Sequence, residues 1–284
     1  MANDALAQLF ERRVQREVSA PVERNTIEEW TAFFGSAWPE CAGDVAPSVM
    51  YTTFVRPAHA PPPGETPPTG VVLHDELKAL LDLPVAIAVG FELEIAGEVR
   101  VGDQLVAVER IAEVGEERTT KFGPGRDWII EVATSTSAGV AIGVEKFRML
   151  GYRPGETGSR PPRLHEELAG FDWNEELDVD ADFIVRGASA NHVWAGAHHH
   201  RDAARAAGLP DIILDTSSQV ALLAGAAQRR FPSRRIRSVD LAMKRPLLPG
   251  AKVMLVGSDG ERSTVVSAVV DEREASRANI TFAN

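Results

Sequence analysis

The sequence predicts an α+β protein of two similar halves, in each of which a curved antiparallel sheet wraps a long helix. The first observation is an order of elements that occurs twice: a helix, a strand, a glycine-containing turn and several antiparallel strands. The second is a Pro/Gly-rich stretch at residues 153–163, which is typical of a linker. The third is that one helix and one curved sheet can bury their apolar faces against each other. We therefore expect an internal duplication, with domains at residues 1–155 and 156–284.

The first half is predicted to begin with a short amphipathic helix. Its apolar face carries Leu6, Leu9, Phe10 and Val14. A surface loop rich in proline and glycine, at residues 56–70, precedes a helix at residues 74–83, because these two residue types interrupt regular structure. Gly102 and Asp103 are predicted to form a tight turn. Strands are expected at residues 89–95, 106–111, 119–122, 128–134 and 140–147.

The second half is predicted to contain its helix at residues 215–229. Asp215 and Thr216 stand at the start, where a side-chain oxygen can accept hydrogen bonds from the free N–H groups of the first turn. The apolar face of this helix carries Val220, Leu223 and Ala224. The strands expected after it lie at residues 236–243, 253–257, 264–271 and 277–282, with a turn around Gly250.

Composition excludes several classes of function. The 284 residues carry a formal net charge of -11, whereas a nucleic-acid surface needs a clustered excess of lysine and arginine. Cys41 is the only cysteine, so an intrachain disulfide is impossible and a reducing cytoplasm is the expected location. A lone cysteine in the loop WPECAGD is more often incidental than nucleophilic. The N-terminal residues include acidic side chains and no continuous apolar run, so we expect neither a signal peptide nor a membrane anchor.

The most informative stretch is ANHVWAGAHHHRDAARAAGLPDII, at residues 190–213. It resembles the signature of the MaoC-like (R)-specific enoyl-CoA hydratases and dehydratases, which runs roughly S-G-D-x-N-P-I-H and then A-x-x-A-G-L/F-P. The tail of the signature is matched by Ala204, Arg205, Ala206, Ala207, Gly208, Leu209 and Pro210. Aligned without gaps, this tail puts His198 at the catalytic histidine of the family. The same alignment puts Val193 at the catalytic aspartate and Ala195 at the asparagine.

The resemblance extends over nearly the whole chain. In the first half, TIEEWTAFFGSAWPE, APSVMYTTFVRP and GFELEIAGEVRVGDQL are similar to successive segments of the FAS1-like dehydratase half of such proteins. In the second half, AAGLPDII and RIRSVDLAMKRPLLPGAKV are similar to the MaoC-like unit. The resemblance implies a double hotdog fold, in which each half is one hotdog domain.

The resemblance also implies a reaction, namely hydration of an enoyl-CoA or dehydration of a 3-hydroxyacyl-CoA. This chemistry needs a base, an acid and hydrogen-bond donors for the thioester oxygen. An imidazole suits the proton transfers, and His198 is the group that this chain keeps. In the family the first half usually lacks the catalytic pair, and its altered helix makes room for a bulky acyl chain. No cofactor is expected, because coenzyme A enters as part of the substrate.

Three replacements for the missing partner of His198 are open. Asn191 or His192 could take the place of the aspartate if the loop containing Gly196 holds extra residues. Asp215 could supply the carboxylate, although a helix N-cap is the alternative interpretation of that residue. His199 could divide the acid and base roles with His198, although residues 199 and 200 could also face solvent in a short helical turn. Adjacent histidines project in different directions and no CxxC or HExxH motif occurs, so we expect no metal site.

The expected substrate contacts lie at both ends of a thioester. Thr216 aligns with the family's glycine whose backbone N–H polarises the carbonyl, and this N–H survives the change. Lys244 and Arg245 belong to a basic stretch that could bind the phosphates of coenzyme A or of a carrier protein. The alternative function is a catalytically degenerate thioester-binding subunit, or the partner subunit of a heteromeric hotdog dehydratase. We accordingly expect a homodimer or a heteromer with another hotdog chain.

Overall fold

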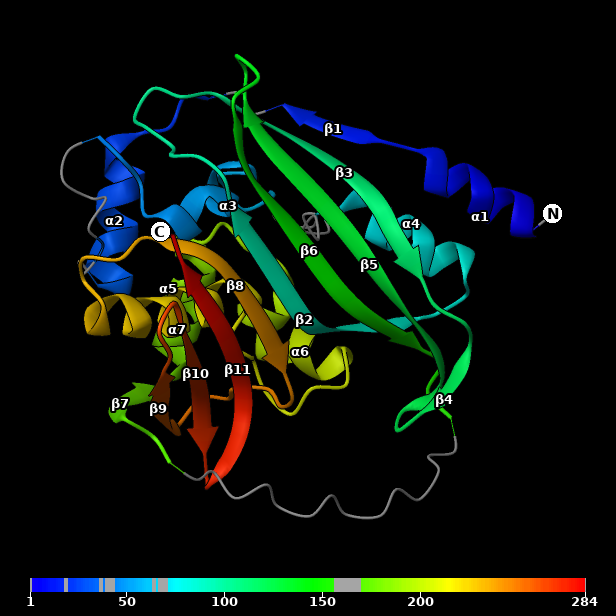
Figure 1. Ribbon diagram of the computed structural model, residues 1–284. Coiled ribbons are helices and arrows are strands. Elements are labelled where there is room, and N and C mark those ends of the chain that lie inside the picture. The colour runs from blue at the N-terminus through cyan, green and yellow to red at the C-terminus, as the bar shows by residue number, and fades with distance from the viewer. Residues whose placement is uncertain are drawn as a thin grey trace.

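One continuous antiparallel sheet forms the framework of the molecule. The computed structural model describes residues 2–17, 20–35, 38, 44–62, 65, 71–155 and 170–283. Within them the sheet is 11-stranded, and β4 pairs only with β5 beside the main path. The order across the sheet is β1, β3, β5, β6, β2, β8, β11, β10, β9 and β7. In Figure 1 β3, β5 and β6 (green) and β2 (teal) of the first half continue into β8, β11 and β10 of the second half (orange to red), with the helices of the second half behind.

The first half supplies the sheet from β1 to β2. Its strands are β1 (Val14–Glu17), β2 (Val85–Ile95), β3 (Leu105–Val114), β4 (Arg118–Thr120), β5 (Gly123–Thr136) and β6 (Ala141–Tyr152). Its helices are α1 (Ala2–Glu11), α2 (Arg24–Phe34), the 3₁₀ helix η2 (Ser48–Met50), α3 (Tyr51–Phe54) and α4 (Val72–Leu80). The predicted helix at residues 74–83 and the predicted long strands of this half are therefore confirmed, with ends shifted by a few residues.

The second half supplies the rest of the sheet and its central helix. Its strands are β7 (Trp173–Val179), β8 (Ile236–Met243), β9 (Ala251–Asp259), β10 (Ser263–Val270) and β11 (Arg273–Phe282). Its helices are α5 (Ala181–Ala190), the 3₁₀ helix η3 (Gly196–His198), α6 (Arg201–Ala206) and α7 (Thr216–Arg230). The predicted helix at residues 215–229 is thus α7, and β8 has the predicted bounds.

Two turns, one in each half, have matching conformations, as an internal duplication predicts. Gly102 precedes β3 with a φ of 91°, and Gly250 precedes β9 with a φ of 86°. Both values lie in the left-handed region that favours glycine, because a Cβ atom there clashes with the backbone. Both turns were predicted from the sequence, and their shared conformation supports an internal repeat.

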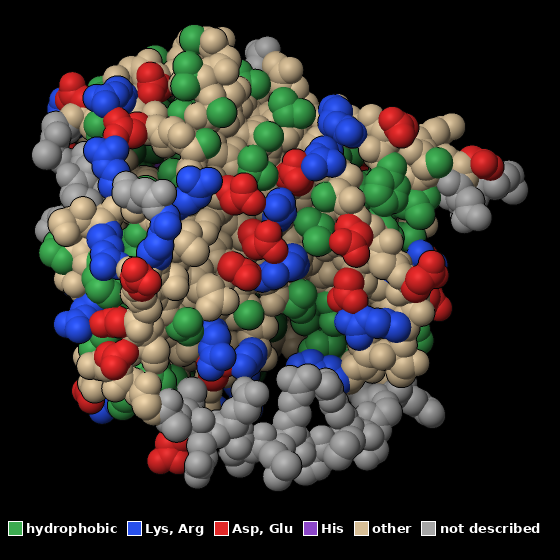
Figure 2. Space-filling model, viewed as in Figure 1, with side chains coloured by type: hydrophobic (Ala, Val, Ile, Leu, Met, Phe, Trp, Pro, Cys, Tyr) green, Lys and Arg blue, Asp and Glu red, His purple; other side chains and the backbone are tan. Residues whose placement is uncertain are grey.

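The two halves meet where β2 pairs with β8. Phe91 lies opposite Leu241 and Leu93 opposite Val239 in this antiparallel pair. The outer face of the joint is charged instead: Arg148 binds Glu92 at 3.1 Å and Asp240 at 2.5 Å. Figure 2 shows acidic and basic side chains interspersed over this face. Because exposed ion pairs contribute about 0–1 kcal/mol each, the buried side of the joint contributes more to its stability.

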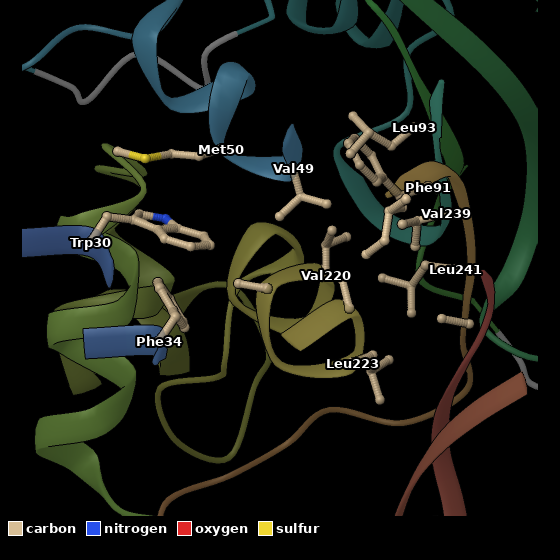
Figure 3. Close-up of a cluster of buried hydrophobic side chains, with 14 of the residues drawn as sticks. Trp30, Phe34, Val49, Met50, Phe91, Leu93, Val220, Leu223, Val239 and Leu241 are labelled. Carbon is tan, nitrogen blue, oxygen red and sulfur yellow. The ribbon is translucent and has the colours of Figure 1, made fainter. Parts of the chain in front are cut away.

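Helix α7 is the centre of the larger core. Val220, Leu223 and Ala224 are buried, as their helical spacing predicts. Figure 3 shows Val220 and Leu223 between strand residues such as Leu241 and helix residues such as Trp30. Burying one such aliphatic side chain contributes about 1.5–3 kcal/mol. The helix is therefore fixed by packing from two sides.

Among the described residues of the first half, no helix is as long as α7. Helix α4 has 9 residues, whereas α7 has 15. Leu73 and Leu77 of α4 pack with Trp128 and Ile130 in a second, smaller apolar cluster. Among the described residues, every helix is too short or too polar to cross a bilayer.

Two sequence predictions need correction. Helix α1 ends at Glu11, so Val14 does not extend its apolar face and instead begins β1, where it pairs with Glu109 and protects the edge of β3. The strand predicted at residues 119–122 ends at Thr120, because the hydroxyl of Thr120 accepts from Phe122 N and donates to Gly123 O, which closes a turn.

Three other sequence predictions fall partly or wholly outside the described residues. Of these predictions, the residues outside the described part are Cys41, residues 156–163 of the predicted linker and parts of the loop predicted at residues 56–70. The domain boundary between residues 155 and 156 therefore stays a prediction.

Candidate functional site

The predicted site residues gather around the amino end of α7. The segment that leads into this helix is fixed at Leu214, whose N–H donates to Leu247 O at 3.0 Å. Thr216 Oγ1 lies 3.7 Å from Met243 Sδ, at the end of β8. His198, in η3, reaches the same lead-in segment. Residues from η3, α7 and the loop after β8 are thus brought together, although they are far apart in the sequence.

His198 has an oriented imidazole ring. The ring is half-buried, and its Nδ1 lies 2.8 Å from Ile213 O. A carbonyl oxygen only accepts hydrogen bonds, so Nδ1 carries the proton of the neutral ring and Nε2 keeps its lone pair. Among the described residues, no carboxylate is hydrogen-bonded to His198. The ring is therefore arranged as a base without an acidic partner.

His199 is anchored to the backbone of its own loop. Its Nε2 lies 2.7 Å from Val193 O, so this nitrogen carries the proton. Burial lowers the pKa of His199 below its ordinary value of 6.5, and neighbouring His198 adds to this, whereas the hydrogen bond to Val193 opposes it. The alternative in which residues 199 and 200 both face solvent is thus wrong for His199, which is half-buried, and correct for His200, which is exposed.

We expect the lowered pKa of His199 to make the fold acid-sensitive. The unfolded chain binds a proton at a higher pH than the folded one, so the stability that neutral His199 contributes is present above pH 6.5. This contribution is lost as the pH falls from 6.5 toward the lower folded-state pKa. Urea midpoints measured from about pH 7.5 to about pH 5 should fall less steeply for His199→Phe than for the wild type. Equal slopes in the two proteins would contradict this assignment.

Asp215 is the N-cap of α7, as its position in the sequence predicts. The side chain is 1% exposed, and its Oδ1 accepts from Ser218 N at 2.9 Å. Its Oδ2 accepts from the hydroxyl of Ser218. Both carboxylate oxygens are therefore engaged by one residue in the first turn of the helix, and neither is hydrogen-bonded to His198.

Asn191 belongs to the same buried network. It is 2% exposed, and its Oδ1 accepts from Trp30 Nε1 at 2.9 Å. Its Nδ2 donates to Ser218 Oγ at 3.1 Å and to Gly187 O at 3.1 Å. The amide thus ties the end of α5 to α7 and to α2, and we interpret Asn191 as a structural residue of the site.

His192 is turned toward the first half. It adopts a φ of 53°, and its Nδ1 lies 3.2 Å from Thr53 O. Burial lowers its pKa, and the cationic Arg56 lowers it further, while the hydrogen bond to Thr53 opposes both. The ring also stacks on Trp194, with ring centroids 6.2 Å apart. These contacts hold His192 against α3, so it does not serve as the hydrogen-bonding partner of His198.

The two predicted phosphate-binding residues lie just past β8. Lys244 forms an ion pair with Glu274, and Arg245 is exposed. Both backbone N–H groups donate to Ala275 O, at 2.8 and 3.1 Å. Because Met243 touches Thr216, this loop is next to the amino end of α7.

Three further residues, Ser218, Arg56 and Glu145, complete the network of the site. Only Ser218, three residues after the cap Asp215, stands at a position that a sequence rule could have indicated. Ser218 bridges Asp215 and Asn191. Arg56 donates to Ser217 Oγ at 2.9 Å and to Asn191 O at 3.1 Å, and its side chain is only 9% exposed. Its other partner is Glu145 Oε2, at 3.4 Å. Among the described residues, no three His, Cys, Asp or Glu side chains come together as a set of metal ligands.

Comparisons with solved structures decide the fold. HtdX from Mycobacterium tuberculosis aligns with a TM-score of 0.63 and 15% identity, over 95% of this chain and 98% of that one. A MaoC-like dehydratase from Phytophthora capsici aligns with a TM-score of 0.69 and 12% identity, over 98% and 97%. A conserved hypothetical protein from Mycobacterium tuberculosis, described as a double hotdog, aligns with a TM-score of 0.59 and 11% identity, over 96% of each chain. The chain has a double hotdog fold.

This fold confirms the architecture that the sequence resemblance implied. The double hotdog here is similar to MaoC-like dehydratases across both halves, including the region of residues 190–213. Neither the protein-family models nor the curated proteins gave a match to the sequence. At identities of 11 to 15% the structural likeness establishes the fold, and the activity has to be argued from the site.

Proposed function

We propose that this double hotdog is an acyl-thioester hydro-lyase, which adds water to a trans-2-enoyl thioester or removes it from a 3-hydroxyacyl thioester. The observation that carries the proposal is the orientation of His198. Its Nδ1–H is held by Ile213 O, which leaves the Nε2 lone pair available beside the amino end of α7. Because the hydrogen bond at Nδ1 fixes the ring, Nε2 keeps one orientation in which it can accept a proton from water.

The proposed reaction balances with this one imidazole. Water loses a proton to His198 Nε2 while its oxygen forms a bond to C3 of the enoyl group. The electron pair of the C2–C3 double bond moves to the thioester oxygen, which accepts a hydrogen bond from the backbone N–H of Thr216. The enolate then takes the proton from the imidazolium at C2. Dehydration is the same sequence in reverse.

A single acid–base group implies slow turnover. A positioned proton-transfer group contributes typically about 10²–10⁴-fold to a rate, and this site lacks the second one at Val193. We therefore expect measurable hydration at a rate well below that of an enzyme with both groups. Coenzyme A is the proposed carrier of the acyl group, with Lys244 and Arg245 near its phosphates.

The test is hydration of crotonyl-CoA by the purified chain. The absorbance of the conjugated thioester should fall faster than in buffer, and mass spectrometry should find a product heavier by one water. A chain that binds crotonyl-CoA, as measured by calorimetry, but leaves its absorbance unchanged would contradict the hydro-lyase proposal.

Binding of crotonyl-CoA without hydration would support another function, a thioester-binding subunit that pairs with a catalytic hotdog chain. One observation favours it: the nearest predicted carboxylate, Asp215, gives both oxygens to Ser218 and none to His198. This candidate predicts binding without turnover by the isolated chain. Turnover should then appear only after a second hotdog polypeptide is added.

A further inference from the structure

A row of positions across the first half of the sheet holds two buried carboxylates. Glu109 of β3 lies opposite Val132 of β5, which lies opposite Glu145 of β6, which lies opposite Leu93 of β2. All four side chains face the interior. Glu109 is 0% exposed and Glu145 is 2% exposed. Carboxylates are rarely buried this deeply unless a partner compensates the loss of water.

The equivalent row of the second half is apolar. Gly257 lies opposite Val266, which lies opposite Ala278, which lies opposite Leu241. Gly257 follows Gly250 at the same spacing as Glu109 follows Gly102, so the two rows correspond. Helix α7 packs on β10 and β11, and Val266, Ala278 and Leu241 belong to the same apolar core as its buried residues. The first half therefore has charged residues where the second half has the apolar residues on which its central helix packs.

Two arginines neutralise the buried carboxylates. Arg16 binds Glu109 at 2.8 Å, and Glu109 also accepts from Val72 N at 3.0 Å. Arg56 binds Glu145 at 3.4 Å. Burial raises the pKa of Glu145, and the charges of Arg56 and Arg16 oppose that rise. These four residues, Arg16, Arg56, Glu109 and Glu145, are called the charged belt below.

On β3 the charged belt lies between the two apolar cores, whereas Phe147 of β6 packs against both of them. On β3, Ala107 belongs to the core around α7 and Ile111 to the core around α4, and Glu109 stands between them on the same face of the strand. The belt also reaches the candidate site, because Arg56 donates to Ser217 in the first turn of α7. If the acyl chain runs from this turn beneath the first half of the sheet, Arg56 and Glu145 are the first residues of the belt that it meets.

We infer that the charged belt restricts this chain to thioesters of short acyl groups, with Arg56 and Glu145 as the residues that set the limit. This inference rests on the proposed function, since it concerns the acyl group at the same site. Arg56 and Glu145 are almost inaccessible to solvent and fill the interior at this point, so a longer methylene chain would have to displace a buried ion pair, which is unfavourable. A short acyl group ends before it reaches the pair.

The test replaces the ion pair by apolar residues of similar size, in the double variant Arg56→Met/Glu145→Leu. Such exchanges of a buried pair are often tolerated, whereas Arg56→Met alone leaves a buried carboxylate uncompensated and should lower the melting temperature further than the double change. Binding of butyryl-CoA and decanoyl-CoA is measured by calorimetry, because these saturated thioesters cannot be hydrated. The ratio of the two dissociation constants reports the selectivity.

We expect wild-type protein to favour butyryl-CoA, and the double variant to shift the ratio toward decanoyl-CoA by at least about tenfold. The matched control is Arg110→Met/Glu131→Leu, which makes the same exchange at a bidentate pair on the outer face of β3 and β5 and should leave the ratio unchanged. An unchanged ratio in the belt variant overturns the inference and leaves the proposed function standing. If wild-type protein binds neither thioester, the proposed function fails, and the inference fails with it.

Discussion

The His198→Ala variant is expected to hydrate crotonyl-CoA about 10²–10⁴-fold more slowly than the wild type. In the proposed reaction His198 both removes the proton from water and returns it to C2, so alanine eliminates both steps. The backbone N–H of Thr216 and the binding of the thioester remain, and they should sustain only a residual rate. We therefore expect kcat to fall much more than KM changes.

The matched control is His200→Ala. His200 is exposed and precedes α6 without a side-chain cap, so its removal should leave the rate and the fold unchanged. Circular dichroism of both variants should match the wild type, because His198 forms one hydrogen bond to the backbone and no contact that fills a core. A His198→Ala protein that keeps the wild-type rate would show that the base lies elsewhere.

The sequence predicted the elements whose signals are local. Helix α7 combines an N-cap with apolar residues at helical spacing, and β8 is a run of alternating side chains between turns. Helix α5 was missed, since Gly187 in its interior disfavours a helix. The structure explains this glycine, because a Cβ there would lie 2.7 Å from Ser218 Oγ. The close approach of α5 to α7 is a feature of the tertiary packing, which the local sequence does not reveal.

The candidate site was predictable to a similar extent. Asp215 could be identified as a cap because its partner, Ser218, is three residues away. Arg56 and Glu145 are 89 residues apart in the chain, and neither stands in a recognisable pattern. Their pairing follows from the register of β6 with the rest of the sheet, which no motif encodes. The resemblance to a family thus indicated the candidate site, while the residues that distinguish this chain required the fold.

The Asp215→Ala variant is expected to lose about 3 kcal/mol of stability. Removing an N-cap costs about 0.5–2 kcal/mol, and here it also leaves the buried hydroxyl of Ser218 without its acceptor, at about 1–3 kcal/mol more. Asp180 is the matched control, since it caps α5 through Phe183 N at 2.7 Å but is exposed. Asp180→Ala should cost only about 1 kcal/mol. Urea unfolding of the two variants measures the difference.

The Asp215→Asn variant separates capping from catalysis. Asparagine keeps an oxygen that accepts from Ser218 N, whereas its NH2 group cannot accept from the Ser218 hydroxyl, so this variant should be less stable than the wild type and more stable than Asp215→Ala. If the carboxylate only caps α7, as its two bonds to Ser218 indicate, the hydration rate stays the same. If it supplies the missing acid to His198, the rate falls while the fold is kept. A slow but folded Asp215→Asn protein would therefore refute the capping interpretation and restore Asp215 as the partner of His198.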